Sequence, residues 1–226
     1  MNEYEFIKRS RSITLHPLEE MYFWIIELDH IDDNEVINAK SLLDDEALRY
    51  SSRYKFDKDR NTSILVHAIL RYYLGKFLQQ EPHEIKIRRT KFGKPYIEND
   101  PIHFNLSSTQ QYAFLAFHLS RPLGIDIEYI NDDLDSLKLA ELFLHPREME
   151  WFKRSPEPKS CFFNFWCAKE ALLKAQGQGF LVEPLPELES SKQLSEGCML
   201  FKSVNFNVYV YDGIIEKHKL AVCIHQ

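Results

Sequence analysis

The chain has 226 residues, of which 44% are hydrophobic, and its formal net charge is −6 at pH 7. This length and composition indicate one large domain or two small ones and exclude a disordered protein. The negative charge argues against a general nucleic-acid binder, which would neutralise many phosphates with lysine and arginine.

The N-terminal residues 1–12 are polar and charged and lack the apolar centre of a signal peptide. No apolar run approaches the ~20 residues that cross a bilayer. The four cysteines form no Cys-x-x-Cys pair, so we expect buried, reduced thiols and neither a zinc site nor disulfides. We therefore expect a cytoplasmic protein with no membrane partner.

The first half begins with a predicted buried strand at residues 21–29, an apolar run of strand length. Ser41 is predicted to cap a helix over residues 41–50, because acidic residues follow it in the first turn. A longer helix is predicted over residues 57–79. Its apolar side chains recur every four residues, at Leu65, Ile69, Tyr73 and Phe77.

Extended segments follow the long helix. Residues 85–89 alternate apolar and basic side chains, and Phe92-Gly93-Lys94-Pro95 is a predicted turn between strands. Further strands are predicted at residues 102–106, 112–119 and 125–129.

The second half repeats this plan, with helices predicted over residues 134–143, 146–154 and 161–176 and strands over 206–211 and 220–225. Gly177 and Gly179 are predicted to end the last helix. Residues 183–197 are rich in Pro, Glu and Ser, which is typical of a surface loop. Each half therefore offers helices and a few strands, so an internal duplication is a hypothesis.

Two acidic motifs are the most informative feature of the chain. Gly124-Ile125-Asp126-Ile127-Glu128 alternates apolar and acidic residues, which places Asp126 and Glu128 on one side of a strand. Trp166-Cys167-Ala168-Lys169-Glu170-Ala171-Leu172-Leu173-Lys174 is typical of a helix, in which Glu170 and Lys174 lie one turn apart. Alone, each is typical of a solvated strand face or a surface ion pair. Brought together, three carboxylates and a lysine would bind a hard divalent cation and a phosphate-bearing ligand.

Two further motifs could contribute to an anion site. Lys94 lies at the centre of the Gly-Lys-Pro turn, where an ammonium group could meet a phosphate. Phe104-Asn105-Leu106-Ser107-Ser108-Thr109 reads as a strand ending in hydroxyl residues, which can hold an anion. Alone, each is as typical of an ordinary turn.

Together, in this order, the four motifs resemble the 4′-phosphopantetheinyl transferase superfamily, of the surfactin-synthetase-activating (Sfp-like) type. The resemblance covers residues 42–224. It implies an α+β fold made of a pseudo-twofold pair of halves, residues 1–120 and 121–226, each a small antiparallel sheet packed with helices. The active site would lie in the cleft between the halves, with the metal site on the second half.

The resemblance also implies a reaction. The 4′-phosphopantetheine arm of coenzyme A would be transferred to a serine of an apo acyl, peptidyl or aryl carrier protein, with release of adenosine 3′,5′-bisphosphate. Carrier proteins of fatty-acid, polyketide and nonribosomal peptide synthesis are all open as partners. Because two halves could supply the whole cleft, we expect a monomer.

By the same resemblance, Asp126, Glu128 and Glu170 would hold Mg²⁺, with Mn²⁺ as an alternative ion. Lys94, Ser107 and Lys174 would contact the phosphates of coenzyme A. Asp126, Glu170 and Lys174 would be catalytic, with Glu170, or a water that it orients, as the base.

The chain departs from the family pattern at the adenosine end of the expected site. Ser108 stands where a histidine usually contacts the 3′-phosphate, and a serine hydroxyl carries no charge. The basic residue expected early in the long helix is either Arg60, the candidate for cofactor binding, or is replaced by Thr62. These differences leave open an altered cofactor preference or a non-catalytic member that binds coenzyme A or a carrier protein. A metal-dependent phosphohydrolase is a further alternative.

Overall fold

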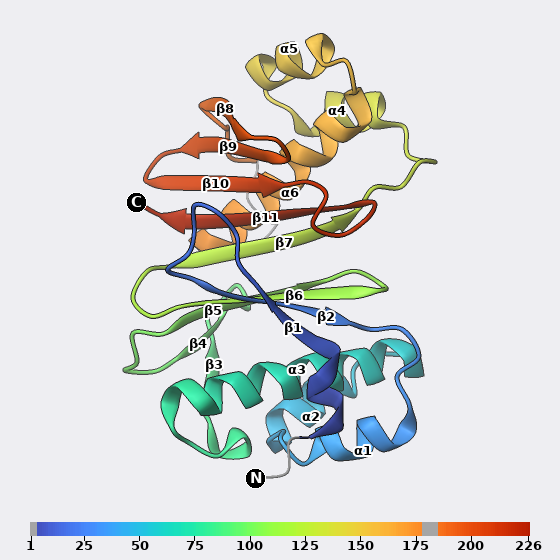
Figure 1. Cartoon of the computed structure of the whole chain (residues 1–226), viewed down its shortest axis with the longest axis vertical. Coiled ribbons are helices and arrows are strands. Elements are labelled where there is room, and N and C mark those ends of the chain that lie inside the picture. Colours follow the sequence, from blue (N-terminus) through green and yellow to red (C-terminus); the bar gives the residue numbers. More distant parts are fainter. Residues whose placement is uncertain (1–3, 178–184) are drawn as a thin grey trace.

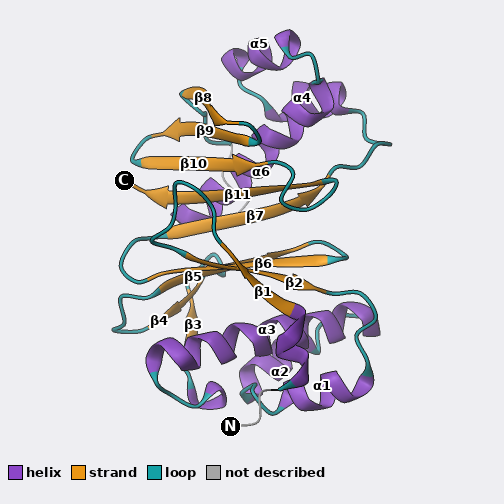
Figure 2. Ribbon diagram, in the orientation of Figure 1, coloured by secondary structure: helices purple, strands orange, loops and turns teal. Residues whose placement is uncertain are grey.

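The computed structural model describes residues 4–177 and 185–226 and shows two α+β halves arranged along one axis (Figure 1). Helices lie towards both ends of the molecule, and the two main sheets meet in the middle (Figure 2). Neighbouring strands in every sheet are antiparallel. The predicted α+β class is therefore confirmed.

The N-terminal half contains a four-stranded sheet in the order β1-β2-β6-β5 and a separate hairpin, β3-β4. The strands are β1 Ser10–Ile13, β2 Tyr22–Glu27, β3 Ile87–Arg89, β4 Pro95–Ile97, β5 His103–Ser108 and β6 Tyr112–His118. The helices are η1 Glu5–Arg9, α1 Asp33–Lys40, α2 Asp45–Ser51, α3 Asp57–Leu78 and η2 Pro82–Glu84. The apolar stripe of α3 packs on the sheet, and this contact forms the core of the half.

The start of α2 differs from the sequence prediction. Ser41 follows the last residue of α1, a helix that the sequence reading missed. The cap of α2 is Asp44, whose carboxylate accepts a hydrogen bond of 2.9 Å from the Ala47 N–H. Ser41 and Asp44 are both residue types that cap helices well, so residue type alone does not show which of them begins α2. The turn between α1 and α2 decides it.

The C-terminal half contains a five-stranded sheet in the order β7-β11-β10-β9-β8. The strands are β7 Leu123–Tyr129, β8 Ser190–Ser195, β9 Cys198–Ser203, β10 Phe206–Tyr211 and β11 His218–His225. The helices are α4 Ser136–Phe143, α5 Pro146–Arg154 and α6 Pro158–Gln176. The longest of these, α6, packs across β7, β11 and β10, and it ends at Gly177, which has a left-handed φ of 68°.

The prediction of a loop over residues 183–197 is wrong for part of this range. Residues 190–195 form the edge strand β8, which pairs with β9, another strand that the sequence reading missed. A polar edge strand carries no buried stripe, so its sequence looks like that of a loop. Residues 183 and 184, like Gly179, lie outside the described residues.

Gly124 permits an unusually close approach of α6 to β7. A Cβ atom at this position would lie 2.1 Å from the carbonyl oxygen of Ala171 and 2.3 Å from the amide nitrogen of Ala175. Only a residue without a side chain fits between strand and helix here. The acidic side of β7 is consequently pressed against the helix that carries Glu170.

The two halves share a core between their sheets. Side chains from β2 and β6, including Phe23 and Phe114, pack with Ile125 and Ile127 of β7. The edge of β7 also meets β5, because the Asn105 side-chain oxygen accepts a hydrogen bond of 2.9 Å from the Ile125 N–H. Residues of the two motif segments thus meet across the boundary between halves.

Two general expectations can be compared with the structure. All four cysteines are free thiols, and Cys167, Cys198 and Cys223 are buried. Across residues 4–177 and 185–226, none of the helices combines the length and the apolar character required to span a membrane.

Candidate functional site

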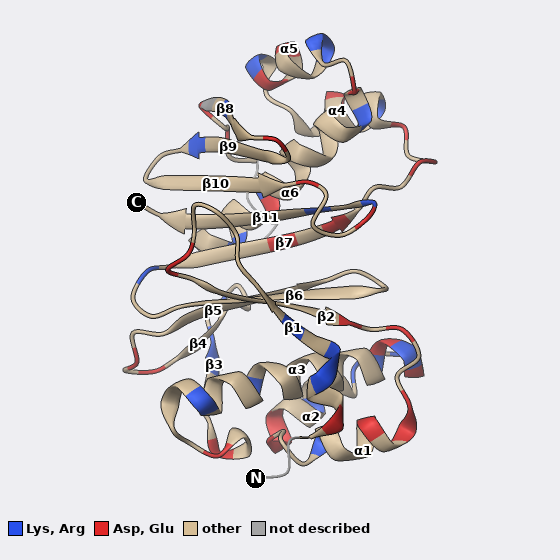
Figure 3. Cartoon of the chain, in the orientation of Figure 1, with Lys and Arg blue, Asp and Glu red and all other residues tan. Residues whose placement is uncertain are grey.

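Strand β7 is covered on both faces, which changes the setting of its two acids. Ile125 and Ile127 face the N-terminal sheet, and Asp126 points to the α6 side, where only 3% of its surface is exposed. Figure 3 shows acidic positions within β7, close to the level at which the two main sheets meet. A solvated strand face is therefore not the environment of Asp126.

Asp126 is the centre of the site. Its Oδ1 atom accepts hydrogen bonds from Ser107 Oγ at 2.8 Å and from Lys174 Nζ at 2.6 Å. Its Oδ2 atom is buried and has no hydrogen-bond partner among the described residues. A buried carboxylate oxygen without a partner carries a desolvation cost that a cation or a donor could offset.

Glu128 and Glu170 lie in the field of the same aspartate. Burial first, and then the charge of Asp126, raises the pKa of Glu128 to about 7 and the pKa of Glu170 to about 8. Glu128 also accepts a hydrogen bond of 3.0 Å from Trp166 Nε1. Each shift means that a second negative charge beside Asp126 is unfavourable without a compensating cation.

Lys174 supplies part of the positive charge that compensates these carboxylates. Burial disfavours its charged form, but Asp126 and Glu170 outweigh burial and raise the pKa of Lys174. Since Ser107 belongs to β5, Asp126 to β7 and Lys174 to α6, their hydrogen bonds join the two halves at one point.

The donor set suits a hard divalent cation, because it consists of carboxylate oxygens and one of them, Asp126 Oδ2, lacks a partner. The side chains of these carboxylates nevertheless do not converge on one point. Within the described residues, no group of three or more His, Cys, Asp or Glu side chains is arranged to hold a metal ion. Lys174 is a cation that contacts Asp126 directly, with its Nζ 2.6 Å from Asp126 Oδ1.

The Lys94 side chain crosses from the β3-β4 turn to the second half. Its Nζ donates to the carbonyl oxygens of Leu123 at 3.0 Å and Ala175 at 2.7 Å, near the C-terminal end of α6. Burial lowers the pKa of Lys94 to about 8. An ammonium group has three donors, so one remains for a further ligand.

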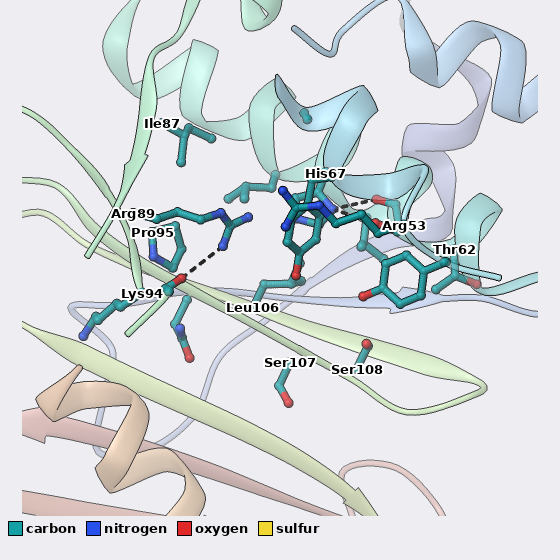
Figure 4. Close-up of a pocket in the computed structure, with 18 of the residues that line it drawn as sticks. Arg53, Thr62, His67, Ile87, Arg89, Lys94, Pro95, Leu106, Ser107 and Ser108 are labelled. Atoms are coloured by element: carbon teal, nitrogen blue, oxygen red, sulfur yellow. Dashed lines mark hydrogen bonds between the residues drawn. The ribbon is translucent and has the colours of Figure 1, made fainter. Parts of the chain in front are cut away.

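A cavity of about 970 Å³ lies beside these groups and is lined by both halves. The expected residues Lys94, Ser107, Ser108 and Lys174 all line it. Figure 4 shows Ser107 and Ser108 across the cavity from Arg53 and His67. Its volume lies at the upper end of the range of small-molecule sites, as a ligand the size of coenzyme A would require.

Arg60, the candidate for cofactor binding, is not among the residues that line this cavity. The α3 residues that do line it include Lys58, Thr62, Val66 and His67. Consecutive helical residues are ~100° apart, so Arg60 lies roughly 200° around the helix from Thr62. Arg60 instead pairs with Asp57.

The sequence reading missed several cavity residues. Tyr50 and Arg53 lie at the end of α2 and just beyond it, and Arg89 ends β3. The Arg89 guanidinium carbon lies 4.5 Å from the centre of the Tyr50 ring. The alternation of residues 85–89 was the only local signal for Arg89.

Lys169, the first charged residue of the helix motif, has a structural partner. Its Nζ lies 2.8 Å from a carboxylate oxygen of Glu148 on α5, and both side chains are almost completely buried. Glu148 also accepts hydrogen bonds from the N–H groups of His145 and Leu188. The pair therefore fixes α5 and the segment before β8 against α6.

Comparison with known proteins gives the same assignment as the motifs. Residues 122–223 match the family model of the 4′-phosphopantetheinyl transferase superfamily, and residues 32–120 match that of the 4′-phosphopantetheinyl transferase N-terminal region. The 4′-phosphopantetheinyl transferase HetI of Nostoc is 34% identical over 80% of this chain and 78% of its own length. The 4′-phosphopantetheinyl transferase gsp of Aneurinibacillus migulanus is 30% identical over 90% and 85%, and Sfp of Bacillus subtilis is 28% identical over 62% of each chain. The chain therefore belongs to the 4′-phosphopantetheinyl transferase superfamily and is a transferase.

Proposed function

We propose that this protein transfers the 4′-phosphopantetheine arm of coenzyme A to a serine of an apo acyl, peptidyl or aryl carrier protein. The observation that carries the proposal is the meeting of Ser107, Asp126 and Lys174 beside Glu128 and Glu170. Of these residues, Ser107 and Lys174 also line the cavity that both halves share. The catalytic residues of this proposal are Asp126, Glu170 and Lys174.

The reaction exchanges one phosphorus–oxygen bond for another. The carrier serine oxygen forms a bond to the phosphorus that bears the pantetheine arm, and the bond from that phosphorus to adenosine 3′,5′-bisphosphate breaks. The serine proton would go to Glu170, or to a water that Glu170 orients. Because the pKa of Glu170 is about 8, it can act as a base only in its ionised form, which a cation beside the carboxylates would favour. Lys174 would offset the negative charge that develops on the leaving bisphosphate.

Asp126, Glu128 and Glu170 would hold Mg²⁺ or Mn²⁺, and the bound ion would withdraw charge from the pyrophosphate oxygens. The chain itself contributes positioning. Ser107 and Lys94 both line the cavity, and their donors would hold phosphate oxygens of coenzyme A. Because most of the barrier to phosphoryl transfer is met by positioning and charge neutralisation, these contacts are central to the proposed activity.

The partners follow from this chemistry. We propose a monomer, because one chain supplies both sides of the cavity. A cytoplasmic location is proposed because the four cysteines are free.

The test is intact-mass analysis of purified apo carrier proteins from fatty-acid, polyketide and nonribosomal peptide systems after incubation with the enzyme, coenzyme A and Mg²⁺. The proposal predicts a mass increase equal to one phosphopantetheine arm on at least one carrier protein. Coenzyme A binding without a mass increase would indicate a non-catalytic member instead. Phosphate release from small esters in the absence of any carrier protein would indicate a phosphohydrolase.

A further inference from the structure

A buried lysine on β11 has no role in the reaction as described so far. The register of β11 and β7 pairs Lys219 with Glu128, and it pairs Ala221 with Asp126. Directly paired residues of neighbouring strands point to the same face of a sheet, so Lys219 lies on the face that carries the acids of the site. Only 1% of the Lys219 side chain is exposed. Lysines are almost never fully buried unless their ammonium group is paired.

The ammonium group of Lys219 joins α6 to the sheet. Its Nζ donates to Ser160 Oγ at 2.8 Å, in the first turn of α6, and to Asp212 Oδ2, in the turn after β10. A further bond runs from α6 back to the same residue, since the Cys167 thiol donates to the Lys219 carbonyl oxygen at 3.6 Å. Lys219 therefore contacts α6 at two points that lie about two helical turns apart.

The apolar contacts of α6 hold it against the sheet but restrict its sliding only weakly. The α6 residues in this core include Ala168, Ala171 and Ala175, and Gly124 of β7 lies against the backbone of the last two. Small side chains interlock little with a neighbouring strand, and apolar attraction is non-directional. A hydrogen bond, by contrast, requires a narrow range of distance and angle. The bond from Lys219 to α6 therefore defines where the helix lies along the sheet.

The position of α6 matters because this helix carries groups that contact the acids of β7. Trp166 Nε1 donates to a carboxylate oxygen of Glu128 at 3.0 Å. Farther along α6, Lys174 Nζ donates to Asp126 Oδ1 at 2.6 Å. A helix moves as a nearly rigid unit, so a displacement of its first turn changes both contacts. A misplacement of about 1 Å at a reacting site can reduce turnover ~100-fold.

We propose that Lys219 is a positioning residue for the transfer reaction. Through Ser160 it sets the position of α6 along the sheet, and through α6 it sets the positions of Glu170 and Lys174 relative to β7. Lys219 is not among the residues that line the cavity between the halves, so it acts on the site only through the helix. This inference rests on the proposed function, since it concerns how the same site is assembled.

The first test is Ser160→Ala, which removes the hydroxyl that joins Lys219 to α6 and leaves the ion pair with Asp212 in place. The kcat should fall ~10- to 100-fold. The KM for coenzyme A should change less, because residues of the N-terminal half form most of the cavity wall. Ser160→Thr keeps the hydroxyl and should restore kcat. Ser160 borders a second cavity of about 350 Å³, which has room for the added methyl group.

Lys219→Met separates positioning from stability. Methionine has a similar volume, and the Asp212 side chain that loses its partner is 54% exposed, so water can solvate it. Replacing a buried ion by an apolar side chain is often neutral for stability when no unpaired charge stays buried. Urea unfolding should therefore match the wild type, whereas kcat falls as in Ser160→Ala. Lys217→Met is the matched control, since Lys217 pairs with Asp132 at the surface, and it should keep wild-type values.

A further measurement requires neither a carrier protein nor a metal. The indole N–H of Trp166 reports the position of α6 over β7 through its bond to Glu128, and the loss of its NMR signal in Trp166→Phe assigns it. This signal should move in Ser160→Ala and Lys219→Met and stay in place in Ser160→Thr and Lys217→Met.

The outcomes distinguish this inference from the proposed function. An unmoved Trp166 signal or a wild-type kcat in Ser160→Ala would overturn the inference, even if the wild type transfers the arm. A Trp166 signal that moves as expected, in a chain that modifies no carrier protein, would contradict only the proposed transfer.

Discussion

A change of pH from about 6.5 to about 8 should destabilise the metal-free protein. Burial and Asp126 raise the pKa of Glu170 from 4.5 to about 8, so the folded state keeps a proton that the unfolded state has released. In that range the folded state binds more protons than the unfolded state, and stability falls as pH rises. Glu128, with a pKa of about 7, acts in the same direction.

The size of this destabilisation follows from the raised pKa of Glu170. One retained proton lowers the free energy of unfolding by up to ~1.4 kcal/mol per pH unit, and the slope flattens as pH approaches the folded-state pKa. For Glu170 alone, the integrated loss between these two pH values is ~1–2 kcal/mol. Two other shifted groups act mainly outside this pH range. The pKa of His67 is lowered to about 4, so His67 changes the stability mainly at lower pH. The pKa of Lys94 is lowered to about 8, so Lys94 changes the stability mainly at higher pH.

The assay is urea unfolding in the presence of a chelator, followed by circular dichroism at several pH values. Glu170→Gln should lose most of the decline, because the amide does not ionise. Glu141→Gln on the exposed face of α4 is the matched control and should keep the decline. A decline of equal size in Glu170→Gln, or stability that rises with pH across the window, would refute the reasoning. Added Mg²⁺ should reverse the decline in the wild type if the carboxylates hold the ion.

Three other changes test separate parts of the structure. Gly124→Ala should lower the free energy of unfolding by ~1–3 kcal/mol or more and reduce transfer, because the added Cβ would overlap the backbone of α6. Urea unfolding measures the stability and the mass assay measures the transfer. A fully stable, fully active variant would contradict the close packing. Lys169→Met should cost ~3–5 kcal/mol, since the buried Glu148 would lose its cation. A double variant that also carries Glu148→Gln should recover part of this loss, because the amide has no charge and its oxygen can still accept from a backbone N–H; no recovery would argue against the pair. Ser108→His should bind coenzyme A more tightly, because an imidazole adds a donor and partial positive charge on the cavity wall. Calorimetry measures the affinity, and weaker or unchanged binding would show that residue 108 does not contact a phosphate.

Elements with strong local signals could be predicted closely. Residues 146–154 and 206–211 have the bounds of α5 and β10, and the predicted helix over residues 57–79 differs from α3 by one residue at its end. These segments combine a clear helical or strand period with capping residues or turns. The helix α1 and the strands β1, β8 and β9 were missed, because these short segments show no clear helical or strand period in the sequence.

The candidate site, too, could be predicted from the sequence only in part. The acidic motifs were recognisable because residue type and spacing place Asp126, Glu170 and Lys174 on defined faces of a strand and a helix. The depth of Asp126 was not predictable, since it depends on Gly124 allowing α6 to approach β7. Arg53 gave no local signal and Arg89 gave only the alternation of residues 85–89, because a tertiary contact brings both arginines to the ring of Tyr50.

The most direct measurement is the intact mass of one apo carrier protein after incubation with coenzyme A and the wild type, Glu170→Gln or Glu141→Gln. Each reaction is run with Mg²⁺ and with excess chelator. The account predicts a phosphopantetheine adduct only with Mg²⁺ and only from the wild type and Glu141→Gln. An adduct formed at the wild-type rate by Glu170→Gln, or in excess chelator, would contradict it.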